Sequence, residues 1–161
     1  MQTELINTAV TDDDRSAAED AAILADEYLA FVSDDLNYAV SAVYITEIIN
    51  NHHITHLPKA PDFIKGIINL RGQIIPIVDI RLRMNRPAAA SENDEMCIVV
   101  IDVNSVAMGL MVDKVSHVVN IKAADILEPP AGNRQELING ITKIGDTVYL
   151  VLDCESLVHN C

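Results

Sequence analysis

Tryptophan is absent from this 161-residue chain, and aromatic residues make up only 4% of it. Half of the residues are nevertheless hydrophobic, so a core has to be built from Ile, Val and Leu. Side chains branched at Cβ pack well on a pleated surface, which favours β-structure. The length suits one ordinary domain with a sizeable core.

Basic residues are scarce, with 11 Lys and Arg against 24 Asp and Glu, a net charge of −13. A nucleic-acid-binding protein needs a basic face to displace counterions from phosphates, so this class is excluded. The charge is unevenly spread, because residues 1–35 hold ten acids and one base. Between Lys59 and Arg86, six bases accompany two acids. A modest basic patch is therefore expected in the folded part.

Long apolar runs are also missing, since no stretch approaches the ~20 residues needed to span a bilayer. The opening stretch has no basic region followed by an apolar one, so no signal peptide is expected. The three cysteines, Cys97, Cys154 and Cys161, are an odd number without close spacing. Buried cysteines in a reducing compartment are the simplest interpretation. These features predict a cytoplasmic protein that does not insert directly into a membrane.

Catalytic motifs are sparse: neither G-x-x-x-x-G-K-[ST] nor G-x-S-x-G occurs. His52, His53 and His56 lie close in sequence, but on a strand His52 and His56 would be about 13 Å apart, too far for one metal ion. Cys154 with His159 offers a nucleophile and a base, although a structural cysteine is favoured there. We therefore expect no enzyme and no cofactor. The alternative is a small metal-dependent or thiol enzyme that uses this histidine cluster or Cys154.

The first 25 residues are polar and acidic and predict a mobile N-terminal arm that adds little to stability. Ser16 and Glu19 have the spacing of a helix capping box, which leaves two alternatives, a short helix or a frayed arm. From residue 26 to 161 the sequence changes to short apolar segments separated by turns. This second part is predicted to form the folded domain.

Short strands dominate residues 26–161. Three two-residue turn signals, at Arg71-Gly72, Asn104-Ser105 and Gly145-Asp146, separate pairs of apolar segments. Residues 44–50 leave strand and short helix open, residues 52–58 predict a further strand, and residues 154–160 predict a short closing helix. The nine or ten expected strands are too closely spaced for βαβ units, so an all-β barrel or sandwich is favoured. The other expected strands lie within residues 28–32, 38–43, 65–70, 73–80, 96–103, 106–115, 116–121, 138–145 and 146–153.

A longer pattern is specific to a known family. The stretch "FIKGIINLRGQIIPIVDIRLRM", residues 63–84, closely resembles the signature of CheW, a coupling protein of bacterial chemotaxis. Weaker similarities follow in the right order: "EYLAFVSDDLNYAVSAVYITEI" from Glu27, "MGLMVDKVSHVVNI" from Met108, and "ITKIGDTVYLVLDCESLV" near the C-terminus. The resemblance extends from Glu27 to the end of the chain.

The resemblance implies two interleaved five-stranded SH3-like barrels with short helices and a hydrophobic groove between them. It also implies a noncatalytic adaptor that joins the cytoplasmic tips of methyl-accepting chemoreceptors to the histidine kinase CheA in chemosensory arrays. The implied partners are the regulatory domain of CheA, the receptor tips and other CheW-like chains.

The resemblance also implies partner-binding residues, beginning with Arg71 at the tip of the signature hairpin. A guanidinium pairs bidentately with a carboxylate, and the implied partner of Arg71 is Glu47, within the fold or at a docking surface. The family usually has Gly at Ala39, a small residue at Lys114 and an acid at His117, and these departures leave partner choice open. The apolar members of the implied site are Ile45, Ile48, Val115 and Val118.

Overall fold

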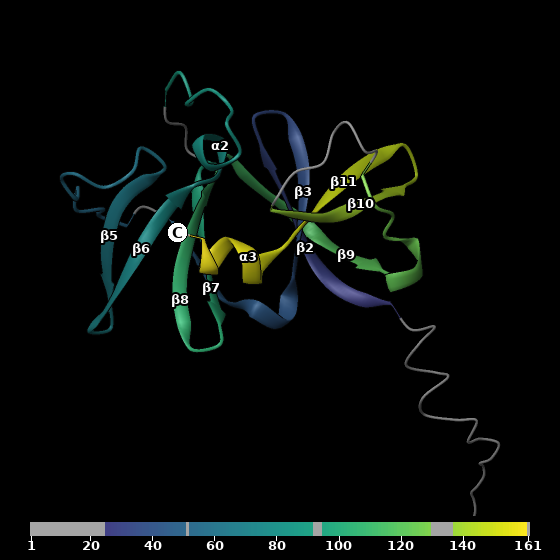
Figure 1. Ribbon diagram of the computed structural model, residues 1–161, viewed down its shortest axis with the longest axis horizontal. Helices are drawn as coiled ribbons and strands as arrows, with labels where there is room; N and C mark the ends of the chain where they lie inside the picture. Colours follow the sequence, from purple (N-terminus) through teal and green to yellow (C-terminus); the bar gives the residue numbers. More distant parts are fainter. Residues whose placement is uncertain (1–24, 51, 92–94, 130–136, 161) are drawn as a thin grey trace, which may run out of the picture.

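The structure is a computed structural model that describes residues 25–50, 52–91, 95–129 and 137–160. The capping-box residues Ser16 and Glu19, and the arm before residue 25, lie outside the described residues. The described part is mostly strand, arranged as two five-stranded sheets (Figure 1). The first sheet has the order β4 (Ile45–Ile49), β7 (Cys97–Val103), β8 (Val106–Val112), β6 (Gln73–Asp79) and β5 (Ile64–Leu70).

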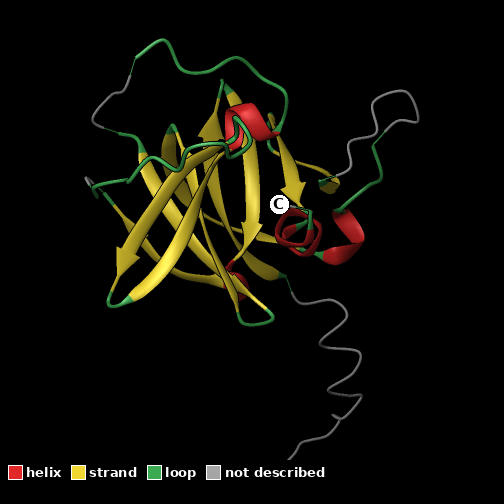
Figure 2. Cartoon of the chain, turned by 60° about the vertical axis from the view of Figure 1, so that its left-hand side comes forward, coloured by secondary structure: helices red, strands yellow, loops and turns green. Residues whose placement is uncertain are grey.

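The second sheet lies beside the first (Figure 1) and has the same pattern of pairing, and Figure 2 shows the predominance of strands in yellow. The helical elements of the described residues are two short α-helices, α2 (Ile80–Arg83) and α3 (Cys154–His159), and two 3₁₀ turns, η2 (Ala42–Tyr44) and η3 (Ala123–Asp125). The expected all-β fold with two five-stranded units is confirmed. The second sheet has the order β10 (Ile138–Ile144), β11 (Thr147–Leu152), β3 (Leu36–Ser41), β2 (Asp26–Ser33) and β9 (Lys114–Ile121).

Each sheet curls until its two edges meet, as in a small barrel. In the first sheet, Thr55 after edge strand β4 forms an isolated antiparallel bridge with Ile67 of the opposite edge strand β5. In the second sheet, Leu127 after β9 bridges Ile141 of β10 in the same way. One pair of residues, rather than a continuous ladder, therefore closes each sheet.

Four details of the local prediction change. The boundary expected after residue 115 moves, since β8 ends at Val112 and β9 begins at Lys114. Residues 52–58 are not a strand, since Thr55 alone pairs there and a turn begins at Pro58. The segment left open at residues 44–50 begins in η2 and continues as β4. The strand expected at residues 38–43 occupies Leu36–Ser41, because the chain turns into η2 after Ser41.

The three predicted hairpin turns are all present, and two of them have positive φ at both central residues. Arg71 and Gly72 both have positive φ, 52° and 85°, as do Asn104 and Ser105. Positive φ at both central residues matches the twist of the flanking strands, and Gly adopts it without steric cost. The turn at Asp34-Asp35 has the same backbone signature without any glycine.

The order of strands and α-helices occurs twice along the chain. Strands β2 to β6 followed by α2 form the first half, and β7 to β11 followed by α3 form the second. Residues seventy positions apart have equivalent partners: Ile45 pairs with Ile101 in the first sheet as Val115 pairs with Phe31 in the second. The two halves are therefore related by an internal pseudo-twofold repeat.

The repeat continues through the second hairpin of each half, with a separation of 74 positions. Gly66 pairs with Ile77 after a register shift, and Gly140 pairs with Val151 after the same shift. Both short helices then begin at an aspartate N-cap, Asp79 for α2 and Asp153 for α3.

The halves do not form separate units, because each sheet takes strands from both. The first sheet combines β4, β5 and β6 of the first half with β7 and β8 of the second. The second sheet combines β2 and β3 with β9, β10 and β11. The largest apolar cluster joins the two sheets, with Phe31 and Val40 from the second sheet and Val99 and Leu110 from the first. This arrangement confirms the interleaving that the resemblance implied.

Candidate functional site

Arg71 and Glu47 form an ion pair on the surface of the first sheet. The Nη1 atom of Arg71 donates to Oε2 of Glu47 at 2.6 Å, and Nη2 donates to Oε1 at 2.9 Å. This parallel pair of bonds is the bidentate geometry that suits a guanidinium and a carboxylate. The hydrogen bonds from Arg71 lower the pKa of Glu47 below its ordinary value.

Local structure explains how the pair forms. Arg71 occupies the first central position of the β5–β6 turn, where Asn69 Oδ1 accepts a hydrogen bond from the Gly72 N–H at 3.0 Å. Glu47 follows a register shift in β4, which puts Thr46 out of pairing and turns Glu47 to the face opposite Ile45. The pair thus spans the two edges of the curled first sheet. The Arg71 side chain remains 73% exposed and that of Glu47 25%.

The apolar residues of the implied site lie on the edge strands β4 and β9. Ile48 and Val118 are exposed, at 42% and 56%. Ile45 and Val115 are half-buried and both pack against the large cluster between the sheets. Ile48 and Val118 are equivalents in the repeat, since they pair with Val99 and Leu29 respectively. The structure brings Glu47 and Arg71 into contact and places the other four residues as two symmetric pairs.

A second polar network escaped the sequence analysis. Arg81 of α2 donates from Nε and Nη2 to both oxygens of Asp113, with a shortest distance of 2.6 Å, and from Nη1 to Asp34 at 3.2 Å. Arg86 reaches the other oxygen of Asp34 at 2.7 Å. Asp34 lies in the β2–β3 turn and Asp113 between β8 and β9, so this Arg81 network ties the sheets together. No pattern in the sequence pairs these residues, because they are 32 to 52 positions apart.

The alternative of a thiol enzyme finds no support at Cys154. Its side chain is buried at the start of α3. Burial, together with the charges of Asp153 and Glu155, raises the pKa of the Cys154 thiol to about 12. A thiol with such a pKa is protonated at neutral pH and is a poor nucleophile. Cys97 is likewise buried, and burial raises the pKa of its thiol.

The histidine cluster does not assemble into a metal site. His53 and His56 are exposed, and the ring of His52 lies against the carbonyl of His53 at 3.2 Å. Among the residues that the structure describes, no group of three or more His, Cys, Asp or Glu side chains could hold a metal ion. Within the same residues, no helix is long and apolar enough to cross a membrane.

Fold and site together define a class: a double-sheet module that displays an ion pair and exposed aliphatic residues on its edges. Comparison with known proteins identifies the family of this module, because residues 27–161 match the CheW-like domain family. The chain belongs to this family, and several of the relatives that it matches are named as chemotaxis proteins.

Individual relatives agree with the assignment. The chain is 29% identical over 135 residues to the chemotaxis protein CheW of Klebsiella aerogenes, covering 82% of this chain and 81% of that protein. It is 36% identical over 104 residues to CheW of Rhizobium meliloti, covering 65% and 66% respectively. The solved structure of the scaffolding protein TtCheW from Thermoanaerobacter tengcongensis superimposes with a TM-score of 0.75 at 28% identity, over 80% of this chain and 88% of that one. The names of these relatives describe chemotaxis proteins and, for the solved structure, a scaffolding protein.

Proposed function

We propose that this chain is an adaptor that couples the cytoplasmic tips of chemoreceptors to the regulatory domain of the histidine kinase CheA, within receptor arrays in the cytoplasm. Family membership supports the adaptor role, and the site residues support binding through the edges of the sheets. Contacts between copies of the chain belong to the same proposal. The proposed binding residues are Ile45, Glu47, Ile48, Arg71, Val115 and Val118.

One observation carries the proposal: the Glu47–Arg71 pair has no counterpart in the other half. His117 occupies the position equivalent to Glu47, and Gly145 the position equivalent to Arg71, although the strands and turns are the same. The β10–β11 hairpin forms the equivalent turn without such a pair, so this kind of hairpin does not need the pair for folding. The exposed guanidinium is then available as an anchor for a partner, a role in which Arg is common.

The exposed aliphatic residues supply apolar area beside this polar anchor. Ile48 and Val118 hold equivalent places on two edge strands, so a partner could use either edge with similar contacts. Lys114 and His117 add positive character beside Val115 and Val118, in contrast to the acidic Glu47 on β4. We therefore assign the two edges to different partners, one to the receptor tip and the other to the kinase.

The test is binding of the full chain to a receptor cytoplasmic fragment and to the regulatory domain of CheA. Arg71→Ala should raise the dissociation constant for at least one partner by about tenfold or more, the effect of losing an interfacial anchor. The melting temperature should change by no more than about 2 °C, because an exposed ion pair adds little to stability. Lys143→Ala, which removes a cation next to the equivalent turn of the second sheet, is the matched control.

A charge-swapped variant tests whether Glu47 and Arg71 contribute to binding through their contact with each other. Glu47→Arg combined with Arg71→Glu should recover part of the binding that either single change loses, if the pair acts as a unit. Normal binding by Arg71→Ala would remove this arginine from the binding site. Unfolding of that variant would make the arginine structural.

A further inference from the structure

The internal repeat allows the two sides of the molecule to be compared position by position. On one side, α2 lies against the β2–β3 turn, and Arg81 fills the space between them by bonding to Asp34 and Asp113. On the other side, α3 lies by the β7–β8 turn, in the equivalent arrangement (Figure 1). This second side is open, with a cleft of about 500 Å³. The residues lining the cleft are Val103, Asn104, Val106, Glu155, Ser156, Val158, His159 and Asn160.

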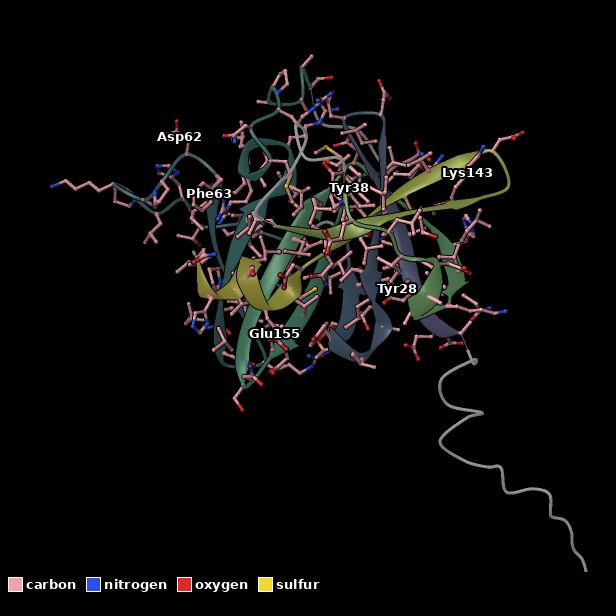
Figure 3. The ribbon with its side chains drawn as sticks, turned by 45° about the vertical axis from the view of Figure 1, so that its right-hand side comes forward. Tyr28, Tyr38, Asp62, Phe63, Lys143 and Glu155 are labelled. Atoms are coloured by element: carbon pink, nitrogen blue, oxygen red, sulfur yellow. The ribbon has the colours of Figure 1, made fainter. Side chains whose placement is uncertain are left out.

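The side chains at the equivalent positions of the two sides differ in charge and polarity. Glu155, two residues after the N-cap of α3, takes the place of Arg81, and Asn104 takes the place of Asp34 in the turn. The third member of the network, Asp113, is replaced by Val43, whose side chain is 82% exposed. The open side therefore has a carboxylate where the other side has a guanidinium. Figure 3 shows Glu155, which carries this carboxylate, on α3.

Glu155 has spare hydrogen-bonding capacity. Among the described residues, its hydrogen-bond partner is the hydroxyl of Tyr44, which donates to Oε2 over a long 3.4 Å. A carboxylate accepts up to about four hydrogen bonds. Of the residues that line the cleft, His159 is the one titratable base, and it lies four positions along the same helical face. A cationic occupant would thus meet an acceptor that the chain leaves largely unused.

Burial and negative charges raise the pKa of two residues that neighbour Glu155, Tyr44 and Cys154. Burial raises the pKa of Tyr44, and the neighbouring charge of Glu155 raises it further. The pKa of Cys154 is raised by burial and then by Asp153 and Glu155. The walls of the cleft are aliphatic at Val106 and elsewhere, which suits the stem of a long side chain or an apolar neighbour.

We propose that the cleft between α3 and the β7–β8 turn is a docking site for an arginine of a partner protein, presented in a short aliphatic segment. On the opposite side, the equivalent space is filled by a guanidinium that the chain itself supplies, that of Arg81. A volume of about 500 Å³ is within the ~300–1,000 Å³ range of ligand sites and holds an arginine with an adjacent aliphatic side chain. None of the six binding residues proposed above lines the cleft, so this inference does not rest on the kinase or receptor assignment.

The test titrates the ¹⁵N-labelled full chain with the blocked peptide acetyl-Leu-Arg-Val-amide and follows the amide resonances by NMR. Saturable shifts are expected at Asn104, Val106 and the α3 residues. The same peptide with citrulline, the neutral analogue of arginine, should bind about fivefold to tenfold more weakly, because it lacks the charge that strengthens a hydrogen bond to a carboxylate. Glu155→Gln should remove this preference, whereas Glu128→Gln, outside the cleft, should leave it unchanged.

A second variant is designed to fill the cleft with an arginine side chain of the protein itself. Val43→Asp, Asn104→Asp and Glu155→Arg together rebuild the Arg81 network on the open side, and this triple variant should no longer bind the arginine peptide. The inference is overturned by any of three results: no saturable shifts up to about 10 mM peptide, equal binding of the citrulline peptide, or wild-type binding by either cleft variant. Shifts of the cleft amides that depend on protein concentration alone, or on removal of residues 1–24, would assign the cleft to a second copy or to the N-terminal arm and overturn it as well.

Discussion

Asp113 contributes to the contact between the two sheets through its hydrogen bonds. It accepts three hydrogen bonds from Arg81, two from Nε and one from Nη2, and one from the Asp34 N–H at 2.9 Å, while its side chain is 17% exposed. Burial is the largest single influence on its titration and opposes ionisation. The bonds from Arg81 and the Asp34 N–H outweigh burial, so the pKa of Asp113 lies below its ordinary value of 3.8.

We expect Asp113→Asn to lower the free energy of unfolding by about 1.5–3 kcal/mol at pH 7, the usual contribution of hydrogen bonds to a charged group. Because the folded pKa is depressed, the stabilisation by Asp113 is complete above its unfolded pKa near 3.8 and is lost as the pH falls through the folded value. Urea denaturation at pH 7 and at about pH 3 should therefore show a difference between wild type and variant that shrinks in acid.

Asp146→Asn, in the exposed β10–β11 turn, is the control for that experiment. It should have little effect at either pH, as usual for surface substitutions. A cost for Asp113→Asn that stayed constant from neutral to acid pH would show that shape rather than charge matters at this position.

At the scale of elements, the second hairpin of each half is held by a close approach of two backbones. A Cβ atom on Gly66 would lie 2.1 Å from the carbonyl oxygen of Thr55, the residue that bridges to Ile67. A Cβ on Gly140 would lie 2.5 Å from the carbonyl oxygen of Leu127, which bridges the second sheet in the same way. Glycine is thus required where each sheet closes.

Two glycines of one hairpin should consequently respond differently to substitution by alanine. Gly66→Ala should lower the free energy of unfolding by more than about 3 kcal/mol or abolish folding, because φ is +149° and the backbone of Thr55 cannot move aside cheaply. Gly72→Ala should cost about 1 kcal/mol, since only its φ of +85° is unfavourable and no atom lies within 4 Å. Thermal and urea unfolding give both values. Similar costs at the two positions would contradict closure of the sheet at Gly66.

At the scale of the whole molecule, interleaving makes the two halves depend on each other. Each sheet is incomplete without strands from the other half, and the largest apolar cluster contains residues of both halves. The connection between the halves runs through the loop after α2, an exposed stretch around residues 87–91. Exposed loops tolerate breaks better than paired strands do.

A chain split after Ala89 tests this dependence. Residues 1–89 and 90–161 should each be unfolded alone, because neither fragment contains a complete sheet. Mixed at equal concentration, they should recover the circular dichroism spectrum and a single cooperative melt of the intact chain, at a lower and concentration-dependent melting temperature. Cooperative folding of either fragment by itself would show that the interleaving is dispensable.

Much of this protein is determined by local sequence. The aliphatic composition, the alternation of apolar residues and the turns at Arg71-Gly72, Asn104-Ser105 and Gly145-Asp146 predicted the strands and hairpins, because these depend on neighbouring residues. Resemblance to the family supplied the interleaving and the pairing of Arg71 with Glu47. The expected strand at residues 52–58 was wrong, since a single bridge to β5 replaces a ladder there.

Only the tertiary structure decided which distant segments meet. Alternation shows which face of a strand is buried but not which strand lies beside it, so the parallel pairings of β3 with β11 and of β6 with β8 could not be read locally. The same holds for Arg81 with Asp34 and Asp113, which are brought together by the packing of two sheets. The open cleft at Glu155 is likewise defined by folding, because its walls come from a turn and a helix about fifty residues apart in the chain.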